Sequence, residues 1–264
     1  MTAPLLTLSA VTAGFGPTTV LHGVDLTVDE GTVGGIFGLN GAGKSVLMKV
    51  VAGLVPARGG VVELGGHDIT RSRPEARVRA GMAHVPQGRQ VFTELTVAEN
   101  LRLGGYALRR RDRAAAAVAL SEVYDRFPLL AQRRSQLAGT LSGGQQAALS
   151  VARALVARPR LICIDEPSAG LSPVAAEELL ASLITLRTSG ITMLLVEQNL
   201  AFGLRLADSA TLLQTGAVVH SGPVATLDAE LLTRLLGVGR LLSGQVATAL
   251  GRPRRRPTKA ATRG

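Results

Sequence analysis

The sequence predicts an α/β fold, in which a largely parallel sheet is covered by helices on both faces. Two observations support this prediction. Short apolar segments of strand length alternate along the chain with segments of helical periodicity, and glycines or helix-capping residues mark the junctions between them. The chain has 264 residues, 46% hydrophobic and 18% charged, a composition typical of a globular domain with a large core.

The first half of the chain contains short strands separated by glycine-rich turns. We expect strands at residues 5–11, 24–28, 33–37, 61–64 and 82–85. Gly34 and Gly35 should weaken the third of these strands, because glycine has no side chain to pack. Residues 44–53 carry apolar side chains at helical spacing, and from about residue 96 to 126 the pattern is helical and rich in Ala, Leu and Arg.

The second half repeats the alternation with longer helices. A helix is expected from Ser142, a good N-cap, to about residue 157. An apolar strand follows at 161–164, then a helix at 174–187 that begins after Pro173, and then a buried strand at 191–196. The order of these elements is that of a parallel α/β sheet.

Membrane insertion and disulfide bonding are not expected. Mean hydropathy is positive, +0.27, but no stretch approaches the roughly 20 uninterrupted apolar residues that a membrane-spanning helix requires. The first ten residues have neither the basic start nor the apolar region of a signal peptide. Without a membrane span or a signal peptide, we expect the protein to stay in the cytoplasm. The only cysteine, Cys163, lies in an apolar strand, so we expect a core residue and no intramolecular disulfide.

The net charge of +10 is unevenly distributed. Residues 238–264 contain seven basic residues and no acidic residue, so the basicity belongs mostly to a C-terminal tail, and no nucleic-acid partner is expected. We expect this tail to be flexible. It is either an unstructured, solubilising end or a patch attracted to anionic lipid headgroups.

A phosphate-binding loop follows the strand at 33–37. It reads Gly38-Leu39-Asn40-Gly41-Ala42-Gly43-Lys44-Ser45 and matches the P-loop pattern between a strand and a helix. Its glycines let backbone N–H groups approach phosphate oxygens, and the N-terminus of the next helix adds its positive dipole. Lys44 would supply a compact charge to the β- and γ-phosphates of ATP, and Ser45 a hydroxyl to Mg²⁺.

Two adjacent acids end the strand at 161–164. Asp165 and Glu166 would lie at the carboxyl edge of the sheet, where open α/β folds bind their ligands. Asp165 would hold Mg²⁺, and Glu166 would act as the general base toward the attacking water. Two acids can also end a strand simply by meeting solvent, but a P-loop in the same chain favours the functional interpretation.

The segment Leu141-Ser142-Gly143-Gly144-Gln145 resembles the signature motif of ATP-binding cassette (ABC) transporter ATPases. The resemblance covers residues 5–237, a nucleotide-binding domain. It implies a P-loop NTPase (RecA-like) core with an N-terminal antiparallel β subdomain and an inserted α-helical subdomain at about 92–150. It also implies that Ser142, Gly143, Gly144 and Gln145 bind the γ-phosphate of an ATP held by the P-loop of another subunit, either a second copy or a sister ATPase.

The same resemblance implies further contacts with the nucleotide. Gln87 matches the Q-loop residue that touches Mg²⁺ and water, and residues 168–172 stand where the D-loop belongs. Phe15 stands where an aromatic ring stacks on adenine, although a lone Phe is more often a core residue. Val46 replaces a second hydroxyl residue and removes one phosphate contact. Gln198 occupies the switch position, usually His; it can hydrogen-bond a γ-phosphate but carries no charge.

Residues 85–92, 95–101 and 196–199 resemble one branch of the family, the second (F-type) ATPase of high-affinity branched-chain amino acid importers, with urea and amide relatives close by. The branch implies an ATP-hydrolysing motor on the inner face of the cell membrane. There it docks on permease subunits through the segment from Gln87 to about Tyr106, and it acts indirectly with a periplasmic or extracellular solute-binding protein. Two alternatives stay open: a non-transport cassette acting on ribosomes or DNA, and a regulatory module with low turnover.

Overall fold

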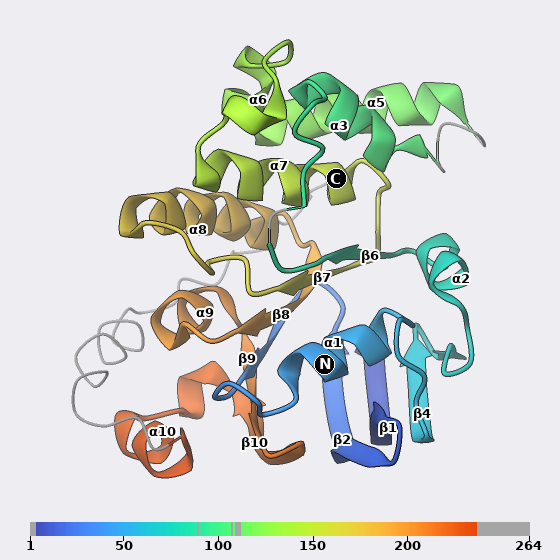
Figure 1. Ribbon diagram of the computed structural model, residues 1–264, viewed down its shortest axis with the longest axis vertical. Coiled ribbons are helices and arrows are strands. Elements are labelled where there is room, and N and C mark those ends of the chain that lie inside the picture. Colours follow the sequence, from blue (N-terminus) through green and yellow to red (C-terminus); the bar gives the residue numbers. More distant parts are fainter. Residues whose placement is uncertain (1–3, 89, 107, 109–111, 237–264) are drawn as a thin grey trace, which may run out of the picture.

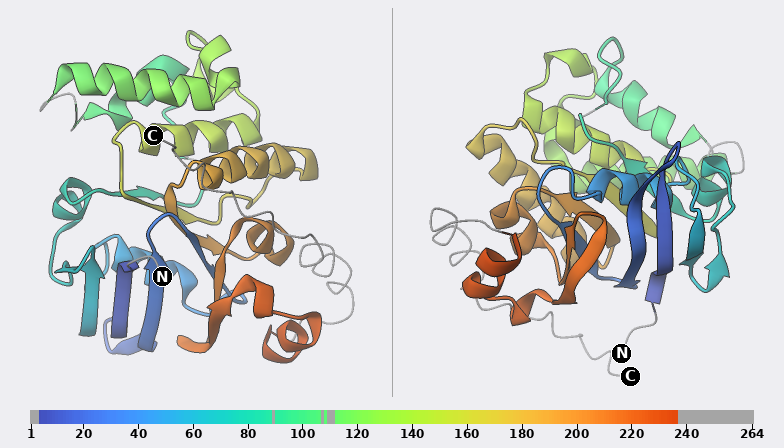
Figure 2. Two further views of the ribbon diagram at one scale, coloured as in Figure 1. Left: turned by 180° about the vertical axis from the view of Figure 1, so that it is seen from behind. Right: turned by 60° about the horizontal axis from the view of Figure 1, so that its bottom comes forward.

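The computed structural model describes residues 4–88, 90–106, 108 and 112–236, and these residues form an α/β fold with two sheets. The basic tail predicted at 238–264 lies outside the described residues. Figure 1 shows stacked helices at the top of the molecule and the strands of both sheets in its middle and lower parts, and Figure 2 shows the same arrangement from behind and from below.

The larger sheet has six strands: β3 (Val33–Phe37), β6 (Met82–Val85), β7 (Leu161–Asp165), β8 (Thr192–Glu197), β9 (Ser209–Gln214) and β10 (Ala217–Pro223). Their order is β10-β9-β3-β8-β7-β6. All neighbours are parallel except β10, which pairs antiparallel with β9. The central strands β3, β7 and β8 are buried along their whole length, which confirms the predicted parallel sheet.

The smaller sheet is antiparallel and comes mainly from the start of the chain. Its strands are β1 (Pro4–Phe15), β2 (Thr18–Asp29), β4 (Gly59–Leu64) and β5 (His67–Asp68), in the order β2-β1-β4-β5. Two of these strands are longer than their apolar segments indicated, because polar residues continue the β1–β2 pairing down to the turn between Phe15 and Thr18. This sheet is the predicted N-terminal antiparallel β unit.

The helices differ in which part of the molecule they cover. They are α1 (Lys44–Val51), α2 (Pro74–Arg79), α3 (Val97–Gly104), α5 (Arg113–Arg126), α6 (Pro128–Gln132), α7 (Gly143–Leu155), α8 (Pro173–Thr188), α9 (Leu200–Leu206) and α10 (Ala229–Leu236). Figure 1 shows α3, α5 and α6 above α7, while α8 lies between α7 and the six-stranded sheet. The helical stretch predicted at 96–126 therefore includes the two separate helices α3 and α5.

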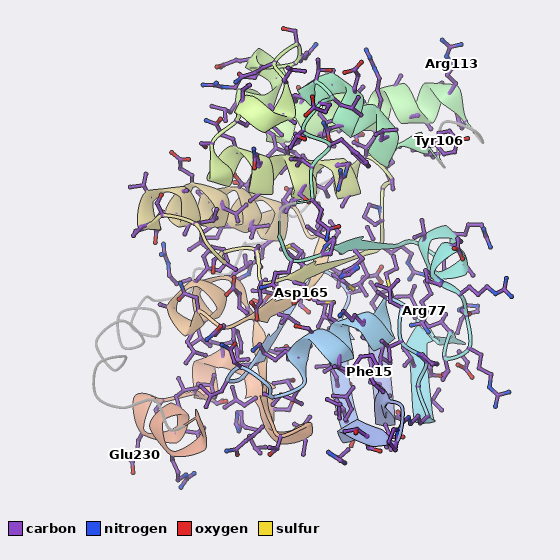
Figure 3. All side chains as sticks on the ribbon, in the orientation of Figure 1. Phe15, Arg77, Tyr106, Arg113, Asp165 and Glu230 are labelled. Atoms are coloured by element: carbon purple, nitrogen blue, oxygen red, sulfur yellow. The ribbon has the colours of Figure 1, made fainter. Side chains whose placement is uncertain are left out.

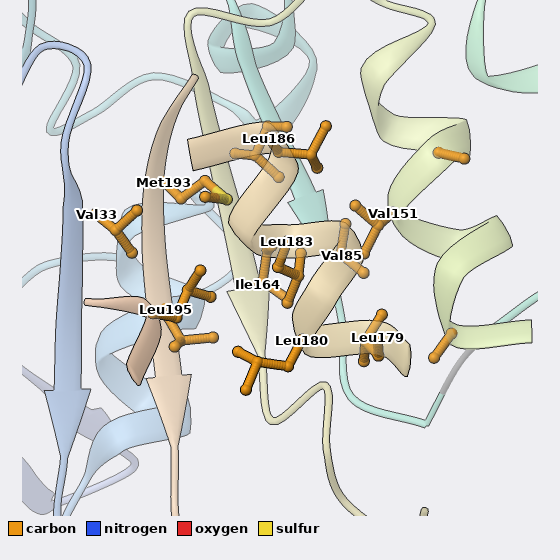
Figure 4. Packing of buried hydrophobic residues seen from close by; sticks show 14 of the residues in the cluster. Val33, Val85, Val151, Ile164, Leu179, Leu180, Leu183, Leu186, Met193 and Leu195 are labelled. Carbon is orange, nitrogen blue, oxygen red and sulfur yellow. The ribbon is translucent and has the colours of Figure 1, made fainter. Parts of the chain in front are cut away.

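Alternate residues of β7 face two different hydrophobic cores. Ile162 and Ile164 belong to the core that includes the buried leucines of α7 and α8, part of which is shown in Figure 4. Leu161 and Cys163 belong to the core that includes α1 and the antiparallel sheet. Because successive strand residues point to opposite faces, α1 and α7 cover opposite faces of the six-stranded sheet. Cys163 is a buried free thiol, as predicted, and burial raises its pKa to about 12.

Close packing explains the two glycines in β3. A Cβ added at Gly35 would lie 2.5 Å from the ring of Phe37, and one added at Gly34 would lie 2.7 Å from a methyl group of Val28. Both distances are shorter than real Cβ contacts, so a side chain at either position would force the neighbouring side chains to move. Glycine therefore makes the packing of this central strand possible, in addition to the weakening expected from the sequence.

Candidate functional site

The P-loop connects β3 to α1 and adopts a backbone that requires glycine. Gly41 and Gly43 have φ angles of 79° and 101°, in the left-handed region. A Cβ at Gly38 would lie 2.3 Å from the backbone oxygen of Leu213. Asn40 and Gly41 are exposed at the tip of the loop, where an anion can approach their N–H groups.

Lys44 begins α1 directly after this loop, and its side chain is only 4% exposed. Its Nζ donates hydrogen bonds to the carbonyl oxygens of Gly38 at 2.9 Å and Leu39 at 3.2 Å. The same Nζ lies 3.7 Å from Oε1 of Glu166. The lysine thus connects the P-loop with the acids that follow β7. Ser45 and Val46, the next residues of the helix, are half-buried.

Asp165 is the last residue of β7 and is 6% exposed. Burial and then the neighbouring Glu166 raise its pKa to about 6, although Lys49 and Lys44 oppose the shift. Its Oδ1 is buried and has no hydrogen-bond partner among the described residues. A buried carboxylate oxygen without a partner is suited to a cation, because a cation would satisfy the oxygen and favour its ionised form.

The described residues contain no group of three or more His, Cys, Asp or Glu side chains that could hold a metal ion by themselves. Mg²⁺ often binds through one or two protein ligands together with substrate phosphates. Asp165 and the hydroxyl of Ser45 form a donor set of this kind, so the residues fit a magnesium ion that arrives with a nucleotide.

Glu166 joins the P-loop to the loop after β6. Its Oε2 accepts a hydrogen bond of 2.8 Å from Nε2 of Gln87, while its Oε1 faces Lys44. Its backbone has a φ of 45°, which is uncommon for a residue with a side chain, and its N–H donates to the oxygen of Val196 at 2.9 Å. Strained backbone of this kind persists where surrounding contacts hold it in place. Three segments far apart in sequence therefore converge on one carboxylate.

The predicted signature motif begins α7. The Ser142 Oγ accepts a hydrogen bond from the N–H of Gln145 at 3.3 Å, and Oε1 of Gln145 accepts one from the N–H of Ser142 at 3.1 Å. This reciprocal pair is a capping box, which fixes where the helix starts. Ser142 is exposed and Gly143 is partly exposed, whereas Gly144 is packed so closely that a Cβ would lie 2.9 Å from the Cβ of Ala175.

The two amide-rich helix starts belong to different layers of the molecule. The P-loop leads into α1 and the signature into α7, and these helices lie on opposite faces of the six-stranded sheet. Figure 1 shows the separation, with α7 above the sheet and α1 below it.

Comparison with known proteins supports the same interpretation. Residues 21–169 match the family model of the ABC transporter. The chain is 38% identical over 223 residues to the high-affinity branched-chain amino acid transport ATP-binding protein BraG of Pseudomonas aeruginosa, an alignment that covers 84% of this chain and 94% of that relative. The chain belongs to the ABC transporter family. As an ATP-binding cassette of this family, it is an ATPase.

Other family members show a similar degree of likeness. The probable branched-chain amino acid transport ATP-binding protein LivF of Archaeoglobus fulgidus is 38% identical over 214 residues, which cover 80% of this chain and 88% of the relative. A crystal structure of a nucleotide-free ABC cassette has a TM-score of 0.77 and 27% identity, and covers 91% of this chain and 98% of its own. A cassette in its ADP conformation also has a TM-score of 0.77, with 27% identity and 96% coverage of both chains. These matches confirm the predicted fold.

Two predicted positions of the cassette lie at the surface. Gln198 follows β8 and is exposed. Phe15 ends β1, with 53% of its surface exposed, and is therefore not the core residue that a lone Phe usually is (Figure 3). An exposed aromatic ring is available for stacking on a planar base.

Glu197 is a residue of the site that the sequence interpretation missed. It is 1% exposed, and its carboxylate accepts hydrogen bonds from the N–H of Ser168 at 2.9 Å and of Asn199 at 3.0 Å. Burial raises its pKa, while these hydrogen bonds oppose the shift. The carboxylate thereby ties the loop after Glu166 to the loop that carries Gln198. Its sequence signal was an acid at the end of an otherwise apolar strand, as at Asp165.

No helix in the part of the chain that the structure describes is both long enough and apolar enough to cross a membrane.

Proposed function

We propose that this cassette is the motor subunit of an importer for branched-chain amino acids or related small polar solutes such as urea and amides. The observation that carries the proposal is the convergence of Lys44, Gln87 and Glu166 beside the buried Asp165. The solute class is supported by the relatives BraG and LivF, which are branched-chain amino acid transport ATP-binding proteins.

In this proposal the P-loop binds the triphosphate of ATP. The N–H groups of the loop, from Gly38 to Gly43, surround the phosphates, Lys44 leaves the loop carbonyls for the β- and γ-phosphates, and Phe15 stacks on adenine. Ser45, Asp165 and Gln87 would hold Mg²⁺, which would supply positive charge to the phosphate oxygens.

Glu166 acts as the general base. Its carboxylate takes a proton from a water molecule whose oxygen bonds to the γ-phosphorus, while the bond from that phosphorus to the β–γ bridging oxygen breaks and leaves ADP and phosphate. The hydrogen bond from Gln87 and the contact with Lys44 hold the carboxylate in position. Gln198 donates a hydrogen bond to the γ-phosphate in place of a histidine.

The separation of α1 from α7 supports a two-subunit site. The signature residues 142–145 would contact the γ-phosphate of an ATP held by the P-loop of the other subunit, a second copy or a sister ATPase. ATP would then close the pair and hydrolysis would reopen it, because only the γ-phosphate bridges the two subunits. The pair would dock on permease subunits at the inner face of the membrane, through the segment from Gln87 to about Tyr106, with a solute-binding protein acting indirectly.

The test is the variant Glu166→Gln, which preserves size and removes the basic carboxylate. We expect steady ATP hydrolysis to fall by at least about 100-fold, while binding of a fluorescent ATP analogue is retained. Glu230→Gln, which changes an exposed glutamate of α10, should hydrolyse ATP at the wild-type rate. Robust hydrolysis by Glu166→Gln would show that this residue is not the base.

A second candidate function is a regulatory cassette with low turnover. It is favoured by the exposed, uncharged Gln198 and by the missing hydroxyl at Val46. The wild-type turnover number measured in the same assay distinguishes the two: a motor sustains hydrolysis at about 1 s⁻¹ or faster, as most enzymes do.

A further inference from the structure

A pocket of about 230 Å³ lies beside the first turn of α7, away from the P-loop. Its walls come from three parts of the chain: the end of α5 with α6, the start of α7, and α8. Figure 1 shows α6, α7 and α8 above one another on the same side of the sheet. The nucleotide site described above uses none of the charged residues of this pocket.

The pocket has one basic and one acidic side chain. Arg126, the last residue of α5, is partly buried, and its Nη1 is buried without a hydrogen-bond partner among the described residues. Glu178 of α8 is exposed, and it is not part of any ion pair found in the described part of the chain. A guanidinium with an unused N–H donor is suited to a carboxylate, and a carboxylate outside any ion pair is suited to an ammonium group.

The rest of the wall is mainly apolar. Phe127, Leu129 and Leu179 line it, and Leu129 keeps 40% of its surface exposed. A site with apolar walls and a few placed charges fixes the orientation of a small molecule through the charges and holds its body through the walls. A volume of about 230 Å³ is below the usual range for drug-sized ligands, so it selects a smaller molecule.

We propose that this pocket binds a free aliphatic α-amino acid of about the size of leucine. Its carboxylate pairs with Arg126, its ammonium group pairs with Glu178, and its side chain packs against Phe127, Leu129 and Leu179. A fatty acid would leave Glu178 without a partner, and a simple amine would leave Arg126 without one. A zwitterion with an apolar side chain provides a partner for Arg126, for Glu178 and for the apolar residues of the wall.

The position of the pocket suggests what binding does. Gly144 and Gln145 of the signature line the pocket, and Gln145 is half of the capping box at the start of α7. An occupant that bridges α5 and α8 would hold this turn against α8 and hinder its movement toward a nucleotide on the other subunit. This regulatory role rests on the proposed function, because the amino acid that the importer delivers would slow the ATPase that drives its import.

Calorimetric titration of the full-length chain with L-leucine tests the binding site. We expect saturable binding of one leucine per chain. Glycine, which lacks the aliphatic body, L-leucinamide, which lacks the carboxylate, and 4-methyl-2-oxopentanoate, which lacks the ammonium group, should each bind at least 10-fold more weakly. Absence of saturable leucine binding overturns the proposal.

Matched variants locate the site. Arg126→Met and Glu178→Gln should each weaken leucine binding at least 10-fold, and Arg126→Lys should retain part of it. The controls Arg113→Met and Glu230→Gln remove the same charges from exposed residues elsewhere, labelled in Figure 3, and should bind leucine as the wild type does. The proposed site is contradicted if a control weakens leucine binding as much as the pocket variant of the same residue type does. It is also contradicted if both pocket variants bind leucine as the wild type does.

ATP hydrolysis is measured in the same samples. Saturating leucine should lower the wild-type rate at least 3-fold and leave the rate of Arg126→Met unchanged. If leucine binds but the rate of ATP hydrolysis does not change, the proposed regulation is wrong. If the wild type hydrolyses ATP and Glu166→Gln does not, but leucine fails to bind, only the pocket proposal is wrong and the proposed motor stands.

Discussion

At the scale of single residues, Asp165 shows most clearly how a residue suited to function can lower the stability of the fold. Its pKa of about 6 lies above the ordinary value of 3.8, so the folded protein binds a proton more readily than the unfolded chain between these two values. The free energy of unfolding therefore rises as the pH falls through this window, and at pH 7 the buried charge opposes folding. A residue kept at this cost is typical of a functional site.

Asp165→Asn should stabilise the protein in the absence of nucleotide. At pH 7 we expect the free energy of unfolding to increase by up to about 3 kcal/mol, because the substitution removes the buried charge. The gain should shrink as the pH falls from 6 to 4, where the wild-type carboxyl becomes protonated. Urea unfolding measured without Mg²⁺ checks this, and Asp125→Asn, an exposed position on α5, is the control. A gain that does not change with pH would contradict the assignment.

At the scale of elements, the start of α7 is both a helix cap and a proposed ligand contact, and these roles can be separated. Thr96 caps α3 with the same reciprocal geometry that Ser142 uses on α7. Ser142→Ala and Thr96→Ala should each lower the free energy of unfolding by about 1 kcal/mol. Only Ser142→Ala should also weaken ATP-dependent dimerisation, measured by sedimentation in the Glu166→Gln background. Equal effects of both substitutions on dimerisation would mean that Ser142 acts through the helix alone.

The end of the P-loop helix depends on one buried arginine. Arg77 of α2 is 2% exposed, and its guanidinium donates to the carbonyl oxygens of Val50 and Val51 at the end of α1, and to those of Thr70 and Ser72. A cation at this helix end also complements the helix dipole. Figure 3 shows Arg77 on the side of the molecule where α2 lies.

Arg77→Met should therefore lower the free energy of unfolding by about 3 kcal/mol, since several buried carbonyl groups would lose their donor. The exposed Arg71→Met, in the loop before α2, should change stability by less than about 0.5 kcal/mol. Urea denaturation of both variants provides the measurement. A wild-type unfolding midpoint in Arg77→Met would show that these hydrogen bonds do not stabilise the fold.

At the scale of the whole molecule, the opposite positions of α1 and α7 favour the proposed site, which two subunits would share. The Glu166→Gln variant with Mg²⁺ and ATP should sediment with twice the monomer mass of 27.3 kDa, provided that two identical chains can pair. Adding Lys44→Ala should return the protein to the monomer, because the shared nucleotide is then lost. A dimer that forms equally without ATP would contradict the nucleotide-bridged arrangement.

Local patterns were sufficient for much of this architecture. The strands at 33–37 and 82–85 have the bounds that their apolar residues indicated, and the P-loop lies between β3 and α1 as its glycines required. The signature begins a helix at the predicted Ser142. These features depend on the conformations of neighbouring residues, so they can be read from short segments.

Short segments of the sequence indicated the order of strands and helices, the glycine loop, the position of the two acids and the resemblance to ABC cassettes. Only the folded chain shows that Gln87 and Lys44 meet at Glu166, that Glu197 is buried between two loops, and that α1 and α7 lie on opposite faces. The difference comes from the sequence separation of the residues in contact. Helical and strand patterns reflect contacts within a few residues, whereas these side chains meet because the order of strands in the sheet brings distant segments to the same edge.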